Sequence, residues 1–530
     1  MSLCQLPRIF LGILALSSAG CASLYEMKLP SKGGPLWLTL QSPHFVVQTD
    51  LSDLEARAFV TQLELRRSAL IAGAWHDAKF KLAVTRVVAF RDTDEIGEFL
   101  PNGVLGLWTV DFSGDKQMLV ARRAGARPLT VSFLGVPVGT IRFDGLEVAT
   151  HELSHELCSA YFASQPPWVG EGLARFLETM KLDEEKHTAI LGAPGPWIPM
   201  AGPDFRRSLP PLAPLLRNEG VNEDAAGDLV FFLINREGKR FDAYLKALFR
   251  GDAPDAAWSA SFPQYVGDAG LARLQSDAGA YLSSGDYRIV IAPLAPFSGQ
   301  VTSTRMPEPE IRAMRGRLFL LADFGDDEAH AKAQQEADAA LQADPTLVDA
   351  MELRVQLAEG VAARMNAAAN ASGLRPDEAR AWMLVDEALG DEAGSADQEA
   401  LRQRSLEKAV ALAPDNARAL SRLARAMAIA GEAAQAGPLV LRSLELMPNN
   451  ADALDTFALV ADKQGLCDAV LRFQRMAVER LPRPQMQQAT QPATETPALR
   501  HWREMTERLH GYELRCGPAR SSQPADAQGP

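Results

Sequence analysis

The chain has 530 residues, of which 47% are hydrophobic and 23% are charged, so it is long enough for several domains and has a globular composition. Lys and Arg total 54 against 67 Asp and Glu, a net charge of −13, which argues against a nucleic-acid partner because an acidic surface releases no counterions from a phosphate backbone. Five cysteines in this length exclude a scaffold held together by disulfides.

The first 20 residues have the order of an export signal. Arg8 precedes an apolar stretch, Ile9–Leu16, and small residues follow up to Gly20. The stretch is too short to span a bilayer, which takes about 20 apolar residues. Residues 1–20 are therefore predicted to be a signal peptide.

Cys21 follows directly, and SAGC resembles the bacterial lipoprotein box, in which the cysteine is lipidated. Ser18 stands where that box usually has Leu, so a plain signal cut after Gly20 is the alternative. The resemblance implies a membrane anchor at Cys21 and a linker over 21–35. Because Ala22 is not acidic, it also implies the outer membrane, facing the periplasm. Without lipidation we expect a soluble periplasmic or secreted protein.

The stretch after the linker mixes strand and helix patterns. Its expected elements are, in order, two short strands in 36–50, a helix over 54–74, a β-rich stretch over 79–90, a hairpin of strands 106–112 and 116–122, and a largely helical stretch to about 287. This pattern predicts an α+β domain over 36–295.

An internal repeat occupies 308–482. Its prolines recur 34 residues apart, at Pro414, Pro448 and Pro482, and glycines recur at the same spacing, at Gly431 and Gly465. Small residues fall where paired helices would cross closely, at Ala424, Ala436, Ser443, Ala458 and Ala477. A 34-residue helix–turn–helix period is the tetratricopeptide signature.

The repeat segment resembles the tetratricopeptide family closely over 415–482 and loosely over 308–413. That resemblance implies an all-α solenoid that binds a so far unknown protein partner on its concave face. Generic Ala-rich helical hairpins are the alternative. The tail, 483–530, is rich in Gln, Pro, Thr, Ser and Ala apart from a helical patch near 498–514, and its last dozen residues are expected to be disordered.

The cysteines outside the signal have separate expectations. Cys467 and Cys516 reach an oxidising compartment after export, so we consider a disulfide that pins the tail to the last repeat. Cys158 is expected to be a buried apolar residue rather than a metal ligand.

Residues 151–156, HELSHE, contain an HExxH motif. Residues i and i+4 lie on one face of a helix, so His151 and His155 can reach the same cation. Glu152 lies on the same turn, where it can take a proton from a metal-bound water. A surface helix with two histidines satisfied by other partners is the alternative.

A catalytic zinc takes three protein ligands and keeps one position for water, so a third ligand is expected downstream. Glu171 follows His155 after 15 intervening residues, within PPWVGEGLARFLE, where Trp168 begins a second helix. The two segments resemble the gluzincin metallopeptidases, whose pattern is HExxH followed by Glu within W-x-x-E-G, and within them the peptidase MA-like branch. Cys158 and Tyr161 stand where the metzincin pattern has Gly and His.

The resemblance implies that His151, His155 and Glu171 hold one Zn²⁺ per chain and that Glu152 is the general base. The implied substrate is a peptide or protein. Zinc would acidify its water and polarise the scissile carbonyl, and Glu152 would pass the proton to the leaving amine. By the same resemblance, strand 116–122 is the edge on which an extended peptide lies.

Two features depart from the family pattern. The 15-residue gap is shorter than in the aminopeptidase and thermolysin branches, and no Tyr or His stands out as the oxyanion donor, although Tyr161, Tyr244 and Tyr265 are candidates.

Glu178 is expected to share the face of Glu171 and to orient a histidine ligand. Its alternatives are a solvated side chain or a partnership with Arg175.

Three hypotheses follow for the whole chain. The preferred one is an exported, lipid-anchored zinc peptidase of α+β fold, fused to an all-α tetratricopeptide solenoid that recruits a partner or substrate. The alternative is a catalytically inactive envelope scaffold that acts through its repeats. The third is a zinc hydrolase that acts on something other than a peptide bond.

Overall fold

The structure is a computed structural model that describes residues 27–516 except 77, 79–81, 101–103, 111–115, 126–129, 134–135, 141–143, 164, 194–208, 218, 221, 285–286, 322–326, 391–393 and 482–496. The predicted signal peptide 1–20, the predicted lipidation site Cys21 and residues 517–530 of the tail lie outside the described residues. Within the described residues, no helix is both long and apolar enough to cross a membrane.

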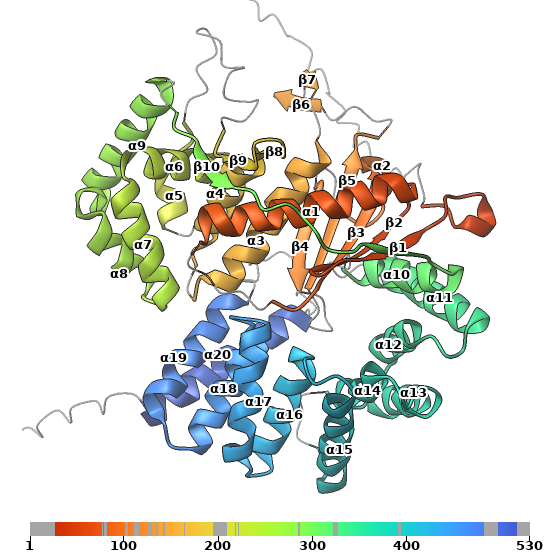
Figure 1. Cartoon of the computed structure of the whole chain (residues 1–530). Coiled ribbons are helices and arrows are strands. Elements are labelled where there is room, and N and C mark those ends of the chain that lie inside the picture. The colour runs from red at the N-terminus through yellow and green to blue at the C-terminus, as the bar shows by residue number, and fades with distance from the viewer. Residues whose placement is uncertain are drawn as a thin grey trace, which may run out of the picture.

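A sheet lies at the centre of the N-terminal domain, and its described part has six strands (Figure 1). Their spatial order is β11 (Thr302–Arg305), β1 (Leu38–Gln41), β2 (Phe45–Thr49), β3 (Thr85–Asp92), β5 (Lys116–Arg123) and β4 (Gly106–Val110). β2, β3 and β5 are parallel, and the other neighbours are antiparallel. The crossover from β2 to β3 is helix α1 (Asp53–Ala74), which begins at a capping box between Ser52 and Glu55.

The hairpin expected from the sequence is present as β4 and β5, with Trp108 opposite Met118. However, β5 is an interior strand, because its second side pairs in parallel with β3. Among the described strands, β4 is the outer one on this side. The prediction that strand 116–122 is the peptide-binding edge is therefore wrong, and β4 has the free edge.

The sheet separates two apolar cores, because successive strand residues point to opposite faces. On the first face Val87 and Ala89 pack with α1, α3 (Gly145–Tyr161) and α4 (Pro167–Glu178). On the second face Val88 and Phe90 pack with α2 (Thr93–Ile96), α10 (Glu308–Leu321) and α11 (Asp327–Ala343). The second core thus joins the strands to helices more than 200 residues later in the chain.

Smaller elements complete the N-terminal domain, and those other than β6 and β7 contribute residues to the first core. They are the strands β6 (Thr130–Phe133), β7 (Val136–Thr140), β8 (Lys181–Asp183), β9 (Thr188–Leu191) and β10 (Val290–Pro293), and the helices α5 (Ala213–Leu216), α6 (Glu223–Arg236), α7 (Gly238–Arg250), α8 (Pro254–Ser261) and α9 (Gly267–Ser284). β6 pairs with β7, and β8, β9 and β10 form a separate sheet. β11 lies beyond the predicted domain end at 295, yet it pairs with β1 of the central sheet.

The helices α10 to α19, which we call the repeat array, follow one another as packed pairs. After α10 and α11 they are α12 (Val348–Leu357), α13 (Val361–Leu374), α14 (Ala379–Leu389), α15 (Ala396–Leu412), α16 (Ala417–Ile429), α17 (Ala433–Leu446), α18 (Ala451–Lys463) and α19 (Cys467–Arg480). α16 and α18 start 34 residues apart, as do α17 and α19. This spacing agrees with the period read from the prolines.

The recurring glycines occupy the turns within the helix pairs. Gly431 has φ 94° and Gly465 has φ 72°, in the left-handed region that glycine adopts without a steric cost. The small residues expected at the helix crossings are buried, namely Ala424, Ala436, Ser443, Ala458 and Ala477. The sequence pattern therefore reflects the geometry of the paired helices.

The repeat array touches the N-terminal domain at both ends (Figure 1). At its start α10 and α11 cover the sheet, and near its end the turn between α17 and α18 and the last residue of α19 contact α3. α20 (Pro497–Cys516), which includes the predicted helical patch, packs against α19 and is joined to it by a disulfide between Cys467 and Cys516.

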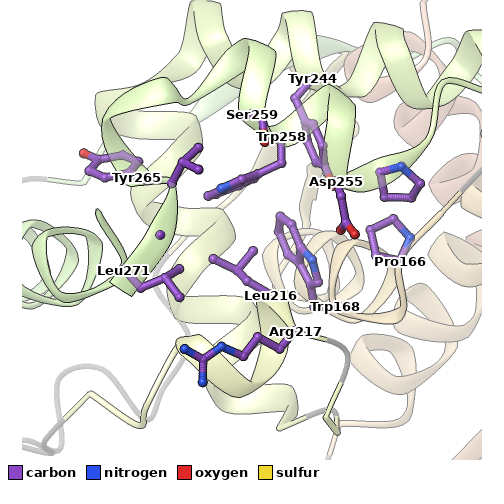
Figure 2. A pocket seen from close by; sticks show the side chains of 13 residues that line it. Pro166, Trp168, Leu216, Arg217, Tyr244, Asp255, Trp258, Ser259, Tyr265 and Leu271 are labelled. Atoms are coloured by element: carbon purple, nitrogen blue, oxygen red, sulfur yellow. The ribbon is translucent and has the colours of Figure 1, made fainter. Parts of the chain in front are cut away.

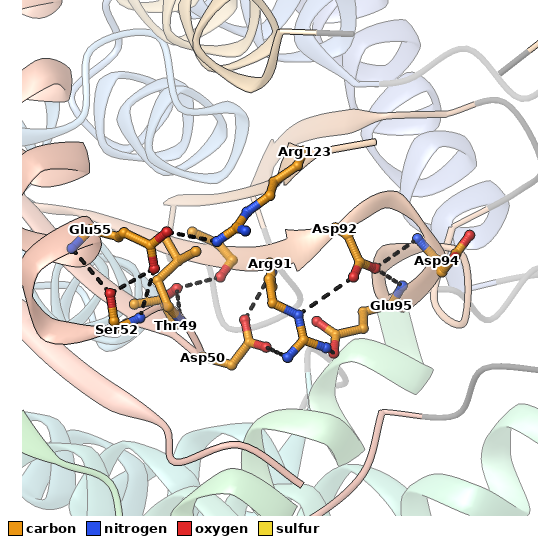
Figure 3. A network of polar contacts seen from close by, with 11 residues as sticks. Thr49, Asp50, Ser52, Glu55, Arg91, Asp92, Asp94, Glu95 and Arg123 are labelled. Carbon is orange, nitrogen blue, oxygen red and sulfur yellow. Dashed lines mark hydrogen bonds and ion pairs between the residues drawn. The ribbon is translucent and has the colours of Figure 1, made fainter. Parts of the chain in front are cut away.

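A charged network lies where the parallel strands β2 and β3 end (Figure 3). The backbone N–H of Arg91 donates to Asp50 over 2.8 Å, and its guanidinium lies 2.6 Å from Glu95. Burial and the neighbouring Asp50 raise the pKa of Glu95 to about 8, and burial also raises the pKa of Asp50. The network therefore contains two carboxyls that resist ionisation together.

Candidate metal centre

Helix α3 carries the HExxH motif against the sheet. Asp144 caps its first turn by accepting a hydrogen bond from the backbone N–H of Leu146. Gly145 allows this turn to lie against β5, because a Cβ there would come within 2.4 Å of the carbonyl oxygen of Ala121. The helix then places His151, Glu152 and His155 on the side toward β4 and α4.

Helix α4 supplies the third candidate ligand, Glu171. Pro167 occupies the first turn, where proline is favoured because no helix hydrogen bond is lost there. Gly172 lets α4 approach α6, since a Cβ at this position would lie 2.3 Å from Val230 and 2.6 Å from the carbonyl oxygen of Ala226. The glycine after Glu171 is thus a packing requirement of the site.

The donor atoms of His151, His155 and Glu171 all lie within 4.8 Å of one another. The two histidine Nε2 atoms are 3.0 Å apart, and the Glu171 carboxylate lies 3.6 Å from His151 Nε2 and 3.5 Å from His155 Nε2. Two ligands at about 2.0–2.1 Å from a tetrahedral zinc are separated by about 3.3 Å. The buried Glu171 Oε2 has no hydrogen-bond partner. The three side chains therefore fit a single cation.

Glu178 lies behind the first histidine. Its carboxylate is 2.8 Å from His151 Nδ1. It therefore favours the tautomer that carries its proton on Nδ1, which leaves the lone pair of Nε2, on the side of Glu171, available to a cation. Arg175 donates to the other carboxylate oxygen over 3.3 Å and also pairs with Glu223 on α6. The expected contact with a histidine and the alternative partnership with Arg175 are thus both present, whereas the solvated alternative is wrong because Glu178 is buried.

The charges at the centre reinforce one another. Burial lowers the pKa of His151, but the contacts with Glu171 and Glu178 outweigh it and raise the pKa to about 10. Burial raises the pKa of Glu171, but the two nearby histidines reverse the effect and hold this pKa well below its usual range. The carboxylates of Glu171 and Glu178 therefore stabilise positive charge at the histidines.

Glu152 is 8% exposed and lies under the edge strand. Burial raises its pKa, which the two histidines and a hydrogen bond from the backbone N–H of Trp108 partly oppose. Gly106 on β4 leaves room for this carboxylate, because a Cβ there would come within 2.9 Å of Glu152 Oε1. Neither Gly106 nor Trp108 was recognised from sequence, since nothing in the hairpin pattern places β4 beside α3.

The three candidate tyrosines have other surroundings. Tyr161 packs against Phe249, and the Tyr265 hydroxyl lies 3.1 Å from Asp277 and 3.3 Å from Glu237. Tyr244 is buried and stacks on Trp168, with ring centroids 6.0 Å apart.

Tyr244 and Trp168 line a cavity of about 160 Å³ together with Trp258 and Tyr265 (Figure 2). The cavity lies at the start of α4, where its lining residue Trp168 precedes Glu171 by three positions. Tyr244 and Tyr265 therefore form an aromatic wall.

Cys158 is buried and unpaired, and burial raises the pKa of its thiol. A thiol kept protonated is a poor metal ligand. This agrees with the expectation that Cys158 is an apolar core residue.

No known family profile and no curated protein matches the chain. Among solved structures it is similar to MamA (18% identity, 32% of this chain and 90% of that chain, TM-score 0.25) and to a thermophilic TPR protein in Thermus thermophilus (16%, 39% and 99%, 0.29). It is also similar to PilW, a type IV pilus biogenesis factor (16%, 39% and 91%, 0.27). These TM-scores support no further argument, so the repeat architecture rests on the helices of this chain.

Proposed function

We propose that this protein is an exported zinc-dependent peptidase of the gluzincin type whose repeat array recruits a protein partner or substrate. The supporting observation is the convergence of His151, His155 and Glu171 from two helices, with Glu178 orienting His151. This combination of two histidines, a carboxylate and an outer carboxylate suits zinc. When bound, zinc would acidify a coordinated water and polarise a peptide carbonyl.

The chain's own residues have separate roles in the proposed reaction. Glu152 takes the proton of the attacking water and gives it to the leaving amine. The backbone N–H of Trp108 fixes the Glu152 carboxylate, and the free edge of β4 offers backbone groups to an extended peptide. The peptide would then lie directly above the base.

A second candidate is the catalytically inactive envelope scaffold. It is favoured by the positions of Tyr244 and Tyr265, whose ring and hydroxyl contacts given above are with residues other than the candidate ligands. A site without an oxyanion donor would lack a hydrogen bond that lowers the activation barrier by about 3–4 kcal/mol in other hydrolases. In this case the repeat array would carry the function by binding a protein.

Zinc content and turnover separate these candidates. Protein starting at Ala22 should contain one equivalent of zinc by native mass spectrometry, and Glu171→Ala should lose it. Glu152→Gln should keep the zinc and lower cleavage of a fluorogenic peptide library by at least about a hundredfold. Zinc in the parent without any cleavage would favour the scaffold.

We also propose that Cys21 is lipidated and anchors the protein to the outer membrane, facing the periplasm. This proposal rests on the SAGC sequence after the apolar stretch. Cys21→Ser should move the protein from the membrane fraction to the soluble fraction.

A further inference from the structure

The C-terminal end of the HExxH helix is covered by the repeat array. The last carbonyl groups of a helix have no partner within it and need one from outside. The Asn449 side-chain amide lies 3.1 Å from the carbonyl oxygens of Ser159 and Ala160 and 3.0 Å from that of Phe162. One amide group, almost 290 residues away in sequence, therefore caps α3.

The backbone at Asn449 is shaped for this contact. Its φ is 60°, in the left-handed region that Asn tolerates better than most residues, and it lies in the turn between α17 and α18. Asp415 occupies the same place one period earlier, where it is exposed and pairs with Arg442. The two turns differ in their backbone, since Asn449 has a positive φ and Asp415 does not, and the turn at Asn449 contacts α3.

Arg480, the last residue of α19, adds a second contact at the same end. Its Nη1 donates to the carbonyl oxygen of Ser159 over 3.4 Å, and its buried Nε and Nη2 have no hydrogen-bond partner. A cation is favourable at a helix C-terminus because the carbonyl groups there carry partial negative charge. Next to it, Ala163 is buried against Leu454 and Met476 of the last repeat.

We propose that the repeat array is a structural part of the metal centre, in which Asn449 and Arg480 are positioning residues that cap α3 and thereby hold His155 in place. His155 lies one turn before Ser159, so fraying of the final turn would reach this ligand. The role in metal binding rests on the proposed function, whereas the cap itself does not.

The cap can be tested without metal by hydrogen exchange on full-length mature protein. Asn449→Gly keeps the left-handed backbone and removes the amide. It should speed exchange of the backbone amides in 156–163 by at least about fivefold, the factor expected for the loss of a single hydrogen bond. Asp415→Gly, the equivalent change one repeat earlier, should leave these amides unaffected. Unchanged exchange in Asn449→Gly would overturn the cap.

Zinc affinity tests the positioning role. Competition with a chromophoric chelator should show the zinc dissociation constant of Asn449→Gly raised about tenfold, as for other residues that support ligands, and that of Asp415→Gly unchanged. Faster exchange with unaltered zinc affinity would overturn the positioning role.

A parent protein that binds no zinc would refute the proposed function, while exchange still decides the cap. If Asn449→Gly gives no cooperative thermal transition, Arg480→Met decides both points by the same measurements, because it removes the second donor and keeps the side-chain length.

Discussion

Glu178 acts on the candidate metal centre through His151 rather than by direct contact with a cation. Its carboxylate holds His151 Nδ1 at 2.8 Å and is itself held by Arg175. Such outer carboxylates fix the ring orientation and increase the basicity of the ligand. The contacts continue from Arg175 to Glu223 on α6, whose exposed side chain we expect to contribute little.

Glu178→Gln should weaken zinc binding by about ten- to a hundredfold, because the neutral amide cannot support His151 as a carboxylate does. A chelator competition titration at pH 7.5 would measure the change. Glu223→Gln is the control, since that residue is exposed and contacts the far side of Arg175. Equal affinities for Glu178→Gln and the parent would contradict the assigned role.

The raised pKa of Glu95 predicts that the stability of the protein depends on pH. Its pKa rises from 4.5 to about 8 on folding, because it is buried and lies beside Asp50. Between these values the unfolded carboxyl is ionised and the folded one keeps its proton, so the free energy of unfolding falls as pH rises from about 4.5 to 8.

Glu95→Gln should remove this pH-dependent loss of stability. Between pH 5 and pH 8 the free energy of unfolding of the variant should therefore rise relative to that of the parent by about 1–3 kcal/mol, after allowance for solvent screening. Urea unfolding at the two pH values would measure it, with the exposed Glu185→Gln as control. A constant difference between variant and parent would show that Glu95 titrates normally.

At the scale of elements, the centre depends on how closely α4 approaches α6. Gly172→Ala should force the helices apart, because the new Cβ would meet the backbone of Ala226. We expect a loss of about 1–3 kcal/mol in stability and a lower zinc content, since Glu171 moves with α4. Gly279→Ala in α9 is the control, because a Cβ there meets nothing within 4 Å. Thermal unfolding and metal analysis would report both effects.

At the scale of the whole molecule, the repeat array and the N-terminal domain share a core. Leu318 and Phe319 of α10 pack with Val88, Phe90 and Leu119 of the sheet. A domain cut at the predicted boundaries would expose this apolar face, because α10 and α11, which cover it, both lie beyond residue 295.

A chain ending at 307 should therefore aggregate or lose cooperative unfolding, whereas a chain ending at 344, which keeps α10 and α11, should retain the sheet. Thermal unfolding by circular dichroism would distinguish them. A cooperative transition of the shorter chain at the parent's temperature would show that the second core is dispensable.

The set of candidate ligands could be anticipated from sequence because its geometry is local. Two histidines four residues apart share a helix face, and Glu171 follows within one helical hairpin. The repeat period was also visible, because each pair of helices needs its own glycine turn and small crossing residues. Such patterns depend on residues that are close in sequence, so they can be recognised without knowledge of the fold.

Non-local contacts were decided by the tertiary structure alone. The order of strands, which makes β4 rather than β5 the edge, depends on a parallel pairing that no sequence pattern of either strand records. The cap of α3 by Asn449 and the covering of the sheet by α10 join residues more than 200 positions apart. The sequence by itself determined the candidate ligands and the helices, and packing between distant segments determined what holds them in place.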